Sequence, residues 1–276
     1  MSYGLAFSEL PAESVERVRR EQLEAAAESL QRDEDPVEAI HDARKRIKKT
    51  RALLRLARPG LKPNAYRRRN RELRDAGRQM SDVRDADVLV ETVDELAERF
   101  VGRHPKRFFA AIRDDLASSG EADPAEHAAR LAVLARDEWP LRGLDADALA
   151  DAITRSYTRG REAFERSTGQ PSTENLHDWR KRVKDLWYQQ RLLEATWPGV
   201  VKAQAKEAKR LSKLLGCDHD LAVLAGAVEE PQLQQLIDER RAELLAEARA
   251  LGRRVYAERP KAFARRVHRY LELAGA

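Results

Sequence analysis

Apolar and polar residues follow a helical period along nearly the whole chain. Ala, Leu, Glu, Arg and Lys dominate, β-branched runs are few, and no segment sustains the alternation of apolar and polar residues that is typical of a strand. The sequence therefore predicts an all-α protein of about ten helices, most of them about 15–25 residues long. Clusters of turn-forming residues mark the expected breaks, at 33–36, 58–63, 102–105, 118–124, 139–143, 169–173, 197–199 and 229–231.

The chain also contains an internal repeat. Alignment of the chain with itself places HDARKRIKKTRALLR at 41–55 on HDWRKRVKDLWYQQR at 177–191, and seven of the fifteen positions are identical. Further along, the same alignment places VRDADVLVETV at 83–93 on DHDLAVLAGAV at 218–228. Because the register slips by only one position between these matches, the sequence indicates that whole helices are duplicated and not a short motif.

The repeat predicts one domain built of two halves, residues 1–142 and 143–276. Each half is long enough for a bundle of four or more helices, so we expect two four-helix-type bundles. The seam is expected near residues 139–145. Duplicated bundles of this kind would face each other across a pseudo-two-fold axis.

Charge is concentrated in two segments of the chain. The formal net charge is only +5, but residues 41–84 hold 16 Lys and Arg against 4 Asp and Glu, a surplus of +12. Residues 177–219 hold 10 against 5, a surplus of +5, which leaves −12 for the rest of the chain. Two basic segments therefore lie within an acidic remainder, and like charges gathered in this way lower stability.

Other features of the sequence indicate the compartment. The single cysteine, Cys217, excludes an intrachain disulfide and a cysteine-cluster metal site. The longest uncharged apolar run, at 221–228, is far too short to span a bilayer, and the N-terminus lacks the regions of a secretory signal. We therefore expect a cytoplasmic protein with no membrane partner.

Basic residues recur at helical spacing in both basic segments. Steps of three and four residues place one set on a single helix face, in a stripe about 21 Å long: His41, Arg44, Lys48, Arg51 and Arg55. The second copy has the same stripe with a tryptophan at one position: His177, Arg180, Lys184, Trp187 and Arg191. Two further stripes match each other in the register of the second alignment: Arg67, Arg71, Arg74 and Arg78 with Lys202, Lys206, Lys209 and Lys213. Two more basic pairs of the repeat extend the candidate set: Lys45 with Lys181, and Arg84 with His219.

Cations stacked over cations predict a site for an extended, multivalent anion. A solvated helix gains from alternating Glu and Lys at i,i+4, which these segments lack. Acidic helices elsewhere are the alternative partners, and their surplus of −12 suffices for part of the charge. His41 and His177 lie near helix starts, where the macrodipole disfavours a positive side chain and favours phosphate oxygens. We interpret both as phosphate contacts, in preference to packing residues.

These segments resemble the CHAD family, the conserved histidine α-helical domain. The resemblance rests on the two HD-containing segments, on RDAD at 84–87 and on DHDL at 218–221, and it covers nearly the whole chain. It implies two four-helix bundles with a basic central groove or pore that binds inorganic polyphosphate, and an association with polyphosphate granules. Two departures between the copies, Trp187 for an arginine and Asp185 for a lysine, indicate that the second half contributes fewer cations.

Two other functions stay open at this stage. The His–Asp pairs at 41–42 and 177–178, reversed at 218–219, would suit a metal-dependent phosphohydrolase, but no histidine precedes the first pair, and each aspartate points about 100° away from its histidine on a helix. A nucleic-acid-binding helical protein fits a pI near 9.3. Aromatic residues, however, make up only 6% of the chain, and no series of them interleaves with the stripes for base stacking. We therefore predict non-catalytic binding of inorganic polyphosphate, with no catalytic residue, metal or cofactor.

Overall fold

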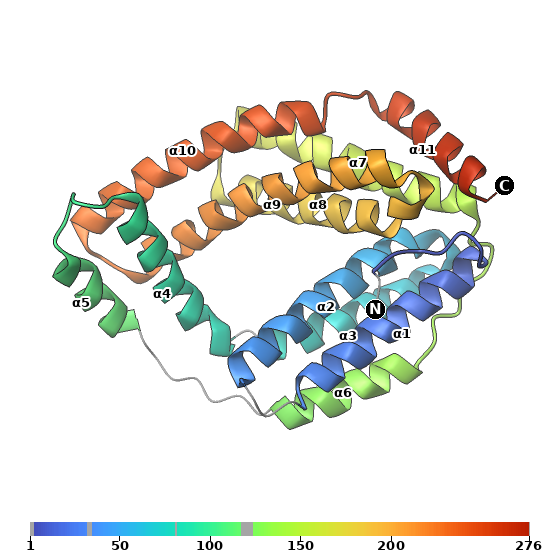
Figure 1. Ribbon diagram of the computed structural model, residues 1–276, viewed down its shortest axis with the longest axis horizontal. Helices are drawn as coiled ribbons and strands as arrows, with labels where there is room; N and C mark the ends of the chain where they lie inside the picture. The colour runs from blue at the N-terminus through green and yellow to red at the C-terminus, as the bar shows by residue number, and fades with distance from the viewer. Residues whose placement is uncertain (1–2, 32–34, 81, 117–123, 276) are drawn as a thin grey trace.

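The computed structural model describes residues 3–31, 35–80, 82–116 and 124–275, with the backbone alone at 82–87 and 124–125. Its described residues form helices and connecting turns without a strand, which confirms the all-α prediction (Figure 1). The elements in chain order are α1 (Pro11–Ser29), α2 (Pro36–Leu56), η1 (Arg58–Gly60), α3 (Pro63–Gln79), α4 (Asp82–Arg99), α5 (Lys106–Leu116), α6 (Pro124–Arg136), α7 (Ala146–Gly169), α8 (Thr173–Leu192), η2 (Glu194–Thr196), α9 (Pro198–Ala227), α10 (Pro231–Val255) and α11 (Pro260–Ala274).

The main hydrophobic core joins helices from both halves of the sequence. In the first half α1 packs on α2 and α6, and α2 packs on α3; in the second, α8 packs on α7 and α9, and α7 packs on α11. The two groups meet where α2 contacts α8 (Figure 1). Ile47 and Leu54 of α2 and Val183 and Leu186 of α8 are at most 2% exposed within this core. Since these apolar positions alternate with the basic stripes, burying them fixes the direction in which the stripes point.

Besides α5, helix α4 packs mainly on α9, with smaller contacts to α10 and α2. Residues of α4, α5, α9 and α10 form a second apolar cluster, at the left of Figure 1. Val93 and Phe100 of α4 contribute to this cluster together with Leu224 of α9 and Leu236 of α10. The packing therefore crosses the predicted seam near 139–145, which lies in the connection between α6 and α7.

Local sequence signals explain where most helices start. Asp35 caps α2 by accepting hydrogen bonds from the amides of Val37 and Glu38. Ser172 caps α8 in the same way by accepting from the amide of Asn175. The predicted breaks agree with helix boundaries along the described residues, while 33–36 and 118–124 overlap residues that are not described.

Two breaks were not predicted. One separates α3 from α4 after Met80, and the other separates α10 from α11 before Pro260. In the second half α9 runs through 30 residues without a break and occupies the positions that match both α3 and the start of α4.

The order of elements follows the sequence repeat. A short 3₁₀ helix follows α2, and another follows α8 at the matching position of the second copy. Helices α3 and α9 each start at a proline, Pro63 and Pro198, as do α6 and α11, at Pro124 and Pro260. The division at residue 142 and the pseudo-two-fold axis stay predictions.

Candidate anion-binding site

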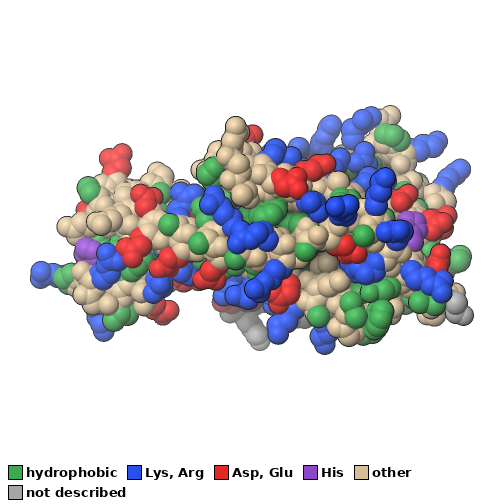
Figure 2. All heavy atoms as spheres, turned by 90° about the horizontal axis from the view of Figure 1, so that it is seen from above, with side chains coloured by type: hydrophobic (Ala, Val, Ile, Leu, Met, Phe, Trp, Pro, Cys, Tyr) green, Lys and Arg blue, Asp and Glu red, His purple; other side chains and the backbone are tan. Residues whose placement is uncertain are grey.

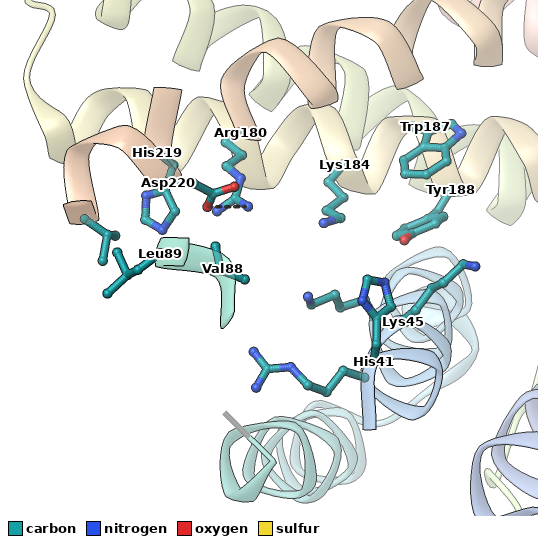
Figure 3. Close-up of a pocket in the computed structure, with 13 residues that line it drawn as sticks. His41, Lys45, Val88, Leu89, Arg180, Lys184, Trp187, Tyr188, His219 and Asp220 are labelled. Carbon is teal, nitrogen blue, oxygen red and sulfur yellow. Dashed lines mark ion pairs between the residues drawn. The ribbon is translucent and has the colours of Figure 1, made fainter. Parts of the chain in front are cut away.

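A cavity of about 590 Å³ lies between α2, α4, α8 and α9 (Figure 3). We call it the main cavity; its wall consists of His41, Arg44, Lys45, Lys48, Val88, Leu89, Arg180, Lys184, Trp187, Tyr188, His219, Asp220 and Val223. In Figure 3 Arg180 and Lys184 extend from α8 into the space that His41 faces from α2. The wall therefore brings together five Lys and Arg side chains with one carboxylate.

A second cavity of about 240 Å³ extends the cationic surface along the same two helices. We call it the adjoining cavity, since it shares Lys48, Arg180, Lys184 and Tyr188 with the main cavity. The residues that it adds are Arg51, Arg55, Lys181, Arg182 and Asp185. The stripe on α2 and the stripe on α8 thus contribute to the same two cavities.

Few carboxylates balance these cations. Asp220 lies 3.9 Å from Arg180 in the main cavity, and Asp185 pairs with Arg55 at 3.0 Å in the adjoining cavity. Arg44 donates a hydrogen bond to the carbonyl oxygen of Met80, which holds its guanidinium at the cavity wall. The outer surface differs, because Lys and Arg are interspersed with Asp and Glu over the face shown in Figure 2.

Repulsion and restricted hydration lower several pKa values in the main cavity. The Lys48 side chain is exposed, but the protein atoms packed around its ammonium, followed by repulsion from Lys184 and Arg44, lower its pKa to about 7. Burial, followed by Arg180, lowers the pKa of His219 to about 4. The walls therefore hold positive charge at a cost in free energy, which an anion would reduce.

His177 lies beside the main cavity and contacts it through another histidine. Its ring centroid is 4.7 Å from that of His219, at an interplanar angle of 30°. Burial, with Lys181 and Arg180, lowers the pKa of His177. The two histidines of the second half therefore form a pair, which the spacing argument did not foresee because they lie on different helices.

The stripe on α3 is not brought to these two cavities. Arg67, Arg71 and Arg78 are exposed on that helix, and Arg67 donates a hydrogen bond to Asn64. Arg74 pairs with the neighbouring Asp75 at 2.9 Å. The side chain of Arg84, the last member of the predicted first-half set, lies outside the described residues.

The lysine stripe on α9 and the end of the α8 stripe also lie elsewhere. Lys202 and Lys206 are exposed, and the Lys209 ammonium lies 6.0 Å from the ring centre of Trp187, on the cavity wall. Lys213 lines a different cavity, with Cys217. Arg191 places its guanidinium 5.2 Å from the ring centre of Tyr3. Whether these side chains take part in binding stays a prediction.

Several wall residues were not among the predicted ones. Asp220 directly follows His219 and points about 100° away from it on the helix, so spacing alone gave no signal that both line the main cavity. Trp187 and Tyr188 contact the core and also line the main cavity, with ring centroids 4.4 Å apart. Arg182 was not a candidate, although it lines the adjoining cavity.

Two features are absent from the described residues. No helix among them is long and apolar enough to cross a membrane. In the same part of the chain, no group of three or more His, Cys, Asp and Glu side chains is arranged to hold a metal ion.

The described residues thus define a helical protein in which two cationic helices, α2 and α8, line the same cavity. The CHAD domain family model matches residues 17–229, so the chain belongs to the CHAD domain family. A solved structure, the crystal structure of the CHAD domain from the plant Ricinus communis, is 17% identical over 99% of this chain and 93% of that chain, with a TM-score of 0.47. No curated protein matches the chain.

Proposed function

We propose that this protein binds inorganic polyphosphate in the main and adjoining cavities without catalysing a reaction. The observation that carries the proposal is that the stripes of α2 and α8, which come from the two copies of the sequence repeat, line the same space. The main cavity alone places five Lys and Arg side chains opposite one carboxylate. Membership of the CHAD family supports the choice of ligand, since polyphosphate binding is a general association of that family.

The chemistry of polyphosphate suits this wall. Each phosphate along the chain carries negative charge, Arg44 and Arg180 offer forked hydrogen bonds to two oxygens, and Lys48 offers a mobile point charge. Cations along both helices allow several phosphates to bind at once. Because each contact releases counterions, the affinity should fall steeply with salt, as it does for nucleic acids.

The test compares two charge reversals on α2. We expect R44E/K48E to weaken binding of long-chain polyphosphate at least tenfold, because both side chains line the main cavity. The matched control is R46E/K49E, which changes the charge equally. Arg46 pairs with Asp42, and the Lys49 ammonium lies 5.3 Å from the ring centre of Tyr3, so neither faces the main or the adjoining cavity.

Isothermal titration at fixed salt gives the readout, with thermal melting as the check on folding. The test variant loses the hydrogen bond from Arg44 to Met80, and the control loses the ion pair of Arg46, so each removes one stabilising contact. The melting curves therefore show whether a loss of binding reflects unfolding. Equal losses in the two double variants would contradict the proposed site.

The same titrations address the alternative functions. Single-stranded DNA of equal charge is expected to bind at least tenfold more weakly than polyphosphate at near-physiological salt. Equal or tighter binding of DNA would favour a nucleic-acid function. We also expect no release of phosphate with Mg²⁺, Mn²⁺ or Zn²⁺. Metal-dependent release that is lost in H41A would favour a phosphohydrolase.

The proposed ligand also suggests a location. A cytoplasmic protein that binds long polyphosphate would be retained on polyphosphate granules by contacts with many chains. The variant R44E/K48E should then be released from granules, whereas R46E/K49E should stay on them.

A further inference from the structure

A third cavity, of about 100 Å³, lies where α2, η1, α3, α7 and α8 come together. We call it the arginine cavity, because five arginines stand in its wall: Arg55, Arg58, Arg155, Arg159 and Arg182. The other wall residues are Tyr66, Ala152, Ser156 and Asp185, so a single carboxylate faces five guanidinium groups. None of these arginines except Arg55 was a candidate from the sequence.

Three of the five guanidinium groups contact other side chains in the part of the chain that the structure describes. Arg55 pairs with Asp185 at 3.0 Å, and Arg182 pairs with Asp178 at 3.1 Å. Arg58 lies over the Tyr66 ring, with its guanidinium carbon 5.2 Å from the ring centre. These contacts fix one side of the cavity wall and leave it with an excess of positive charge.

The other two arginines stand one helical turn apart on α7. Arg155 and Arg159 are both exposed, and neither forms an ion pair with a carboxylate in the described part of the chain. Residues at i and i+4 share a helix face, so both guanidinium groups line the same cavity from one side. Like charges at this spacing destabilise a helix, and an anion between them would remove that cost.

The size of the cavity limits the ligand. About 100 Å³ suits one tetrahedral phosphate group, whereas the main cavity, at about 590 Å³, has room for several. Arginine is the side chain best suited to such a group, because its planar fork donates two parallel hydrogen bonds to two oxygens. Ser156 adds a hydroxyl donor to the wall.

The arginine cavity continues the adjoining cavity, with which it shares Arg55, Arg182 and Asp185. The ion pair of Asp185 with Arg55 stands in the wall common to both. Asp185 occupies the position that matches Lys49 in the first copy, so this carboxylate is a feature of the second half alone. Asp185 therefore stands between the adjoining cavity, which continues the main cavity, and the arginine cavity, which has room for one phosphate group.

We propose that the arginine cavity is a second oxyanion site, which binds a single phosphate group through Arg58, Arg155 and Arg159. The phosphate group is either part of a small free ion such as pyrophosphate or the terminal group of a chain whose body lies in the other two cavities. The first source is independent of the function proposed above, and the second rests on it. Both use the same chemistry at the same three arginines.

The test removes the two arginines of α7 and measures two ligands separately. R155S/R159S is compared with R253S/R254S, which removes two exposed arginines from the last turn of α10, away from all three cavities. Pyrophosphate and long-chain polyphosphate are titrated into each full-length protein by calorimetry at fixed salt. We expect R155S/R159S to bind pyrophosphate at least tenfold more weakly than wild type, and R253S/R254S to stay within about twofold.

A third variant separates this site from the main cavity. R180E/K184E should lose long-chain polyphosphate and keep pyrophosphate, because Arg180 and Lys184 do not line the arginine cavity. Pyrophosphate binding that needs Arg155 and Arg159 supports the second site even if long chains do not bind at all. If R155S/R159S loses tenfold in affinity for long-chain polyphosphate alone, the phosphate group in the arginine cavity is the end of a chain, and both proposals are supported.

The remaining outcomes overturn the second site. One is that R155S/R159S matches R253S/R254S for both ligands, which would mean that the arginines of α7 act only through overall charge. Another is that wild type binds neither ligand, which would overturn both proposals together. Since Arg155 and Arg159 are exposed, the double variant should melt within a few degrees of wild type, and the melting curve verifies this.

Discussion

The affinity of the main cavity for polyphosphate should depend on pH through Lys48. The ammonium of Lys48 is repelled by Arg44 of its own helix and by Arg180 and Lys184 of α8, and it is attracted by Asp220 of α9. Limited hydration is the largest cause of its depressed pKa, about 7, and the repulsion adds to it. A phosphate beside the ammonium favours the charged form. The pKa of Lys48 therefore rises on binding, and the complex takes up a proton at neutral and higher pH.

The size of the effect follows from the two pKa values of this lysine. If the bound value returns to its usual level of about 10.4, the affinity falls by about tenfold for each pH unit above 7. Relative to pH 6, the loss is at most about tenfold at pH 8 and about a hundredfold at pH 9, because the Lys48 side chain is exposed and water screens part of the repulsion that lowers its pKa. His219, with a pKa of about 4, changes affinity only on the acid side of this range. The alkaline slope is therefore assigned to one lysine.

Two substitutions at position 48 test this assignment by calorimetry with long-chain polyphosphate between pH 6 and 9 at constant ionic strength. K48R stays charged throughout, so its affinity should be nearly flat and should exceed that of wild type at pH 9. K48Q should bind polyphosphate weakly, with an affinity that does not change with pH. The control is K49R: Lys49 has a pKa of about 8 but does not line the main or the adjoining cavity, so its replacement should leave the slope unchanged. A K48R protein that keeps the slope of wild type would refute the reasoning.

Two further substitutions test the packing and charge around the site. D185N should raise the affinity for long-chain polyphosphate severalfold and lower the free energy of unfolding by about 1–3 kcal/mol, because Arg55 loses its carboxylate next to other cations. Calorimetry and urea unfolding measure both effects, and D42N, which breaks the ion pair with Arg46 outside the three cavities, should lower stability without raising affinity. G160A should cost about 1–3 kcal/mol in urea unfolding, because its Cβ would collide with the Tyr256 hydroxyl oxygen in the core. G169A, whose Cβ would meet nothing within 4 Å, should leave stability unchanged or slightly raised, and equal losses in both glycine variants would contradict the packing argument.

The sequence predicted those features that depend on local spacing. The helical period and the turn-forming clusters predicted an all-α chain, and the structure confirms it. Steps of three and four placed Arg44 and Lys48 on one face of α2, and both line the main cavity, whereas Arg46 pairs with Asp42 off that face. Spacing is sufficient here because one regular helix carries all of these residues.

Spacing along one helix does not determine which other helix packs against it, so the tertiary contacts could not be predicted from the sequence. Nothing local indicated that α4 would pack on α9 and α10 of the second half while lining the main cavity through Val88 and Leu89. The arginines of α7 lie on the helix before the second HD segment and belong to no repeated stripe, so only the tertiary packing relates Arg155 and Arg159 to Arg55. Helix α9 runs unbroken where the first copy of the repeat has α3 and α4, and spacing in the sequence did not predict this difference either.

The depressed pKa of Lys48 also relates the binding site to the stability of the fold. In the unfolded chain the pKa of this lysine returns to its usual value, so between about pH 7 and 10 the unfolded state binds more protons than the native state. The contribution of Lys48 to the free energy of unfolding therefore rises with pH across this range. Below pH 7 the lysine is charged in the native protein and its destabilising effect is complete. Affinity changes in the opposite direction, because only the protonated lysine attracts phosphate. Near neutral pH the cation that destabilises the free protein is the one that a bound polyanion would neutralise, so the proposed binding would be thermodynamically linked to folding at the contact between α2 and α8.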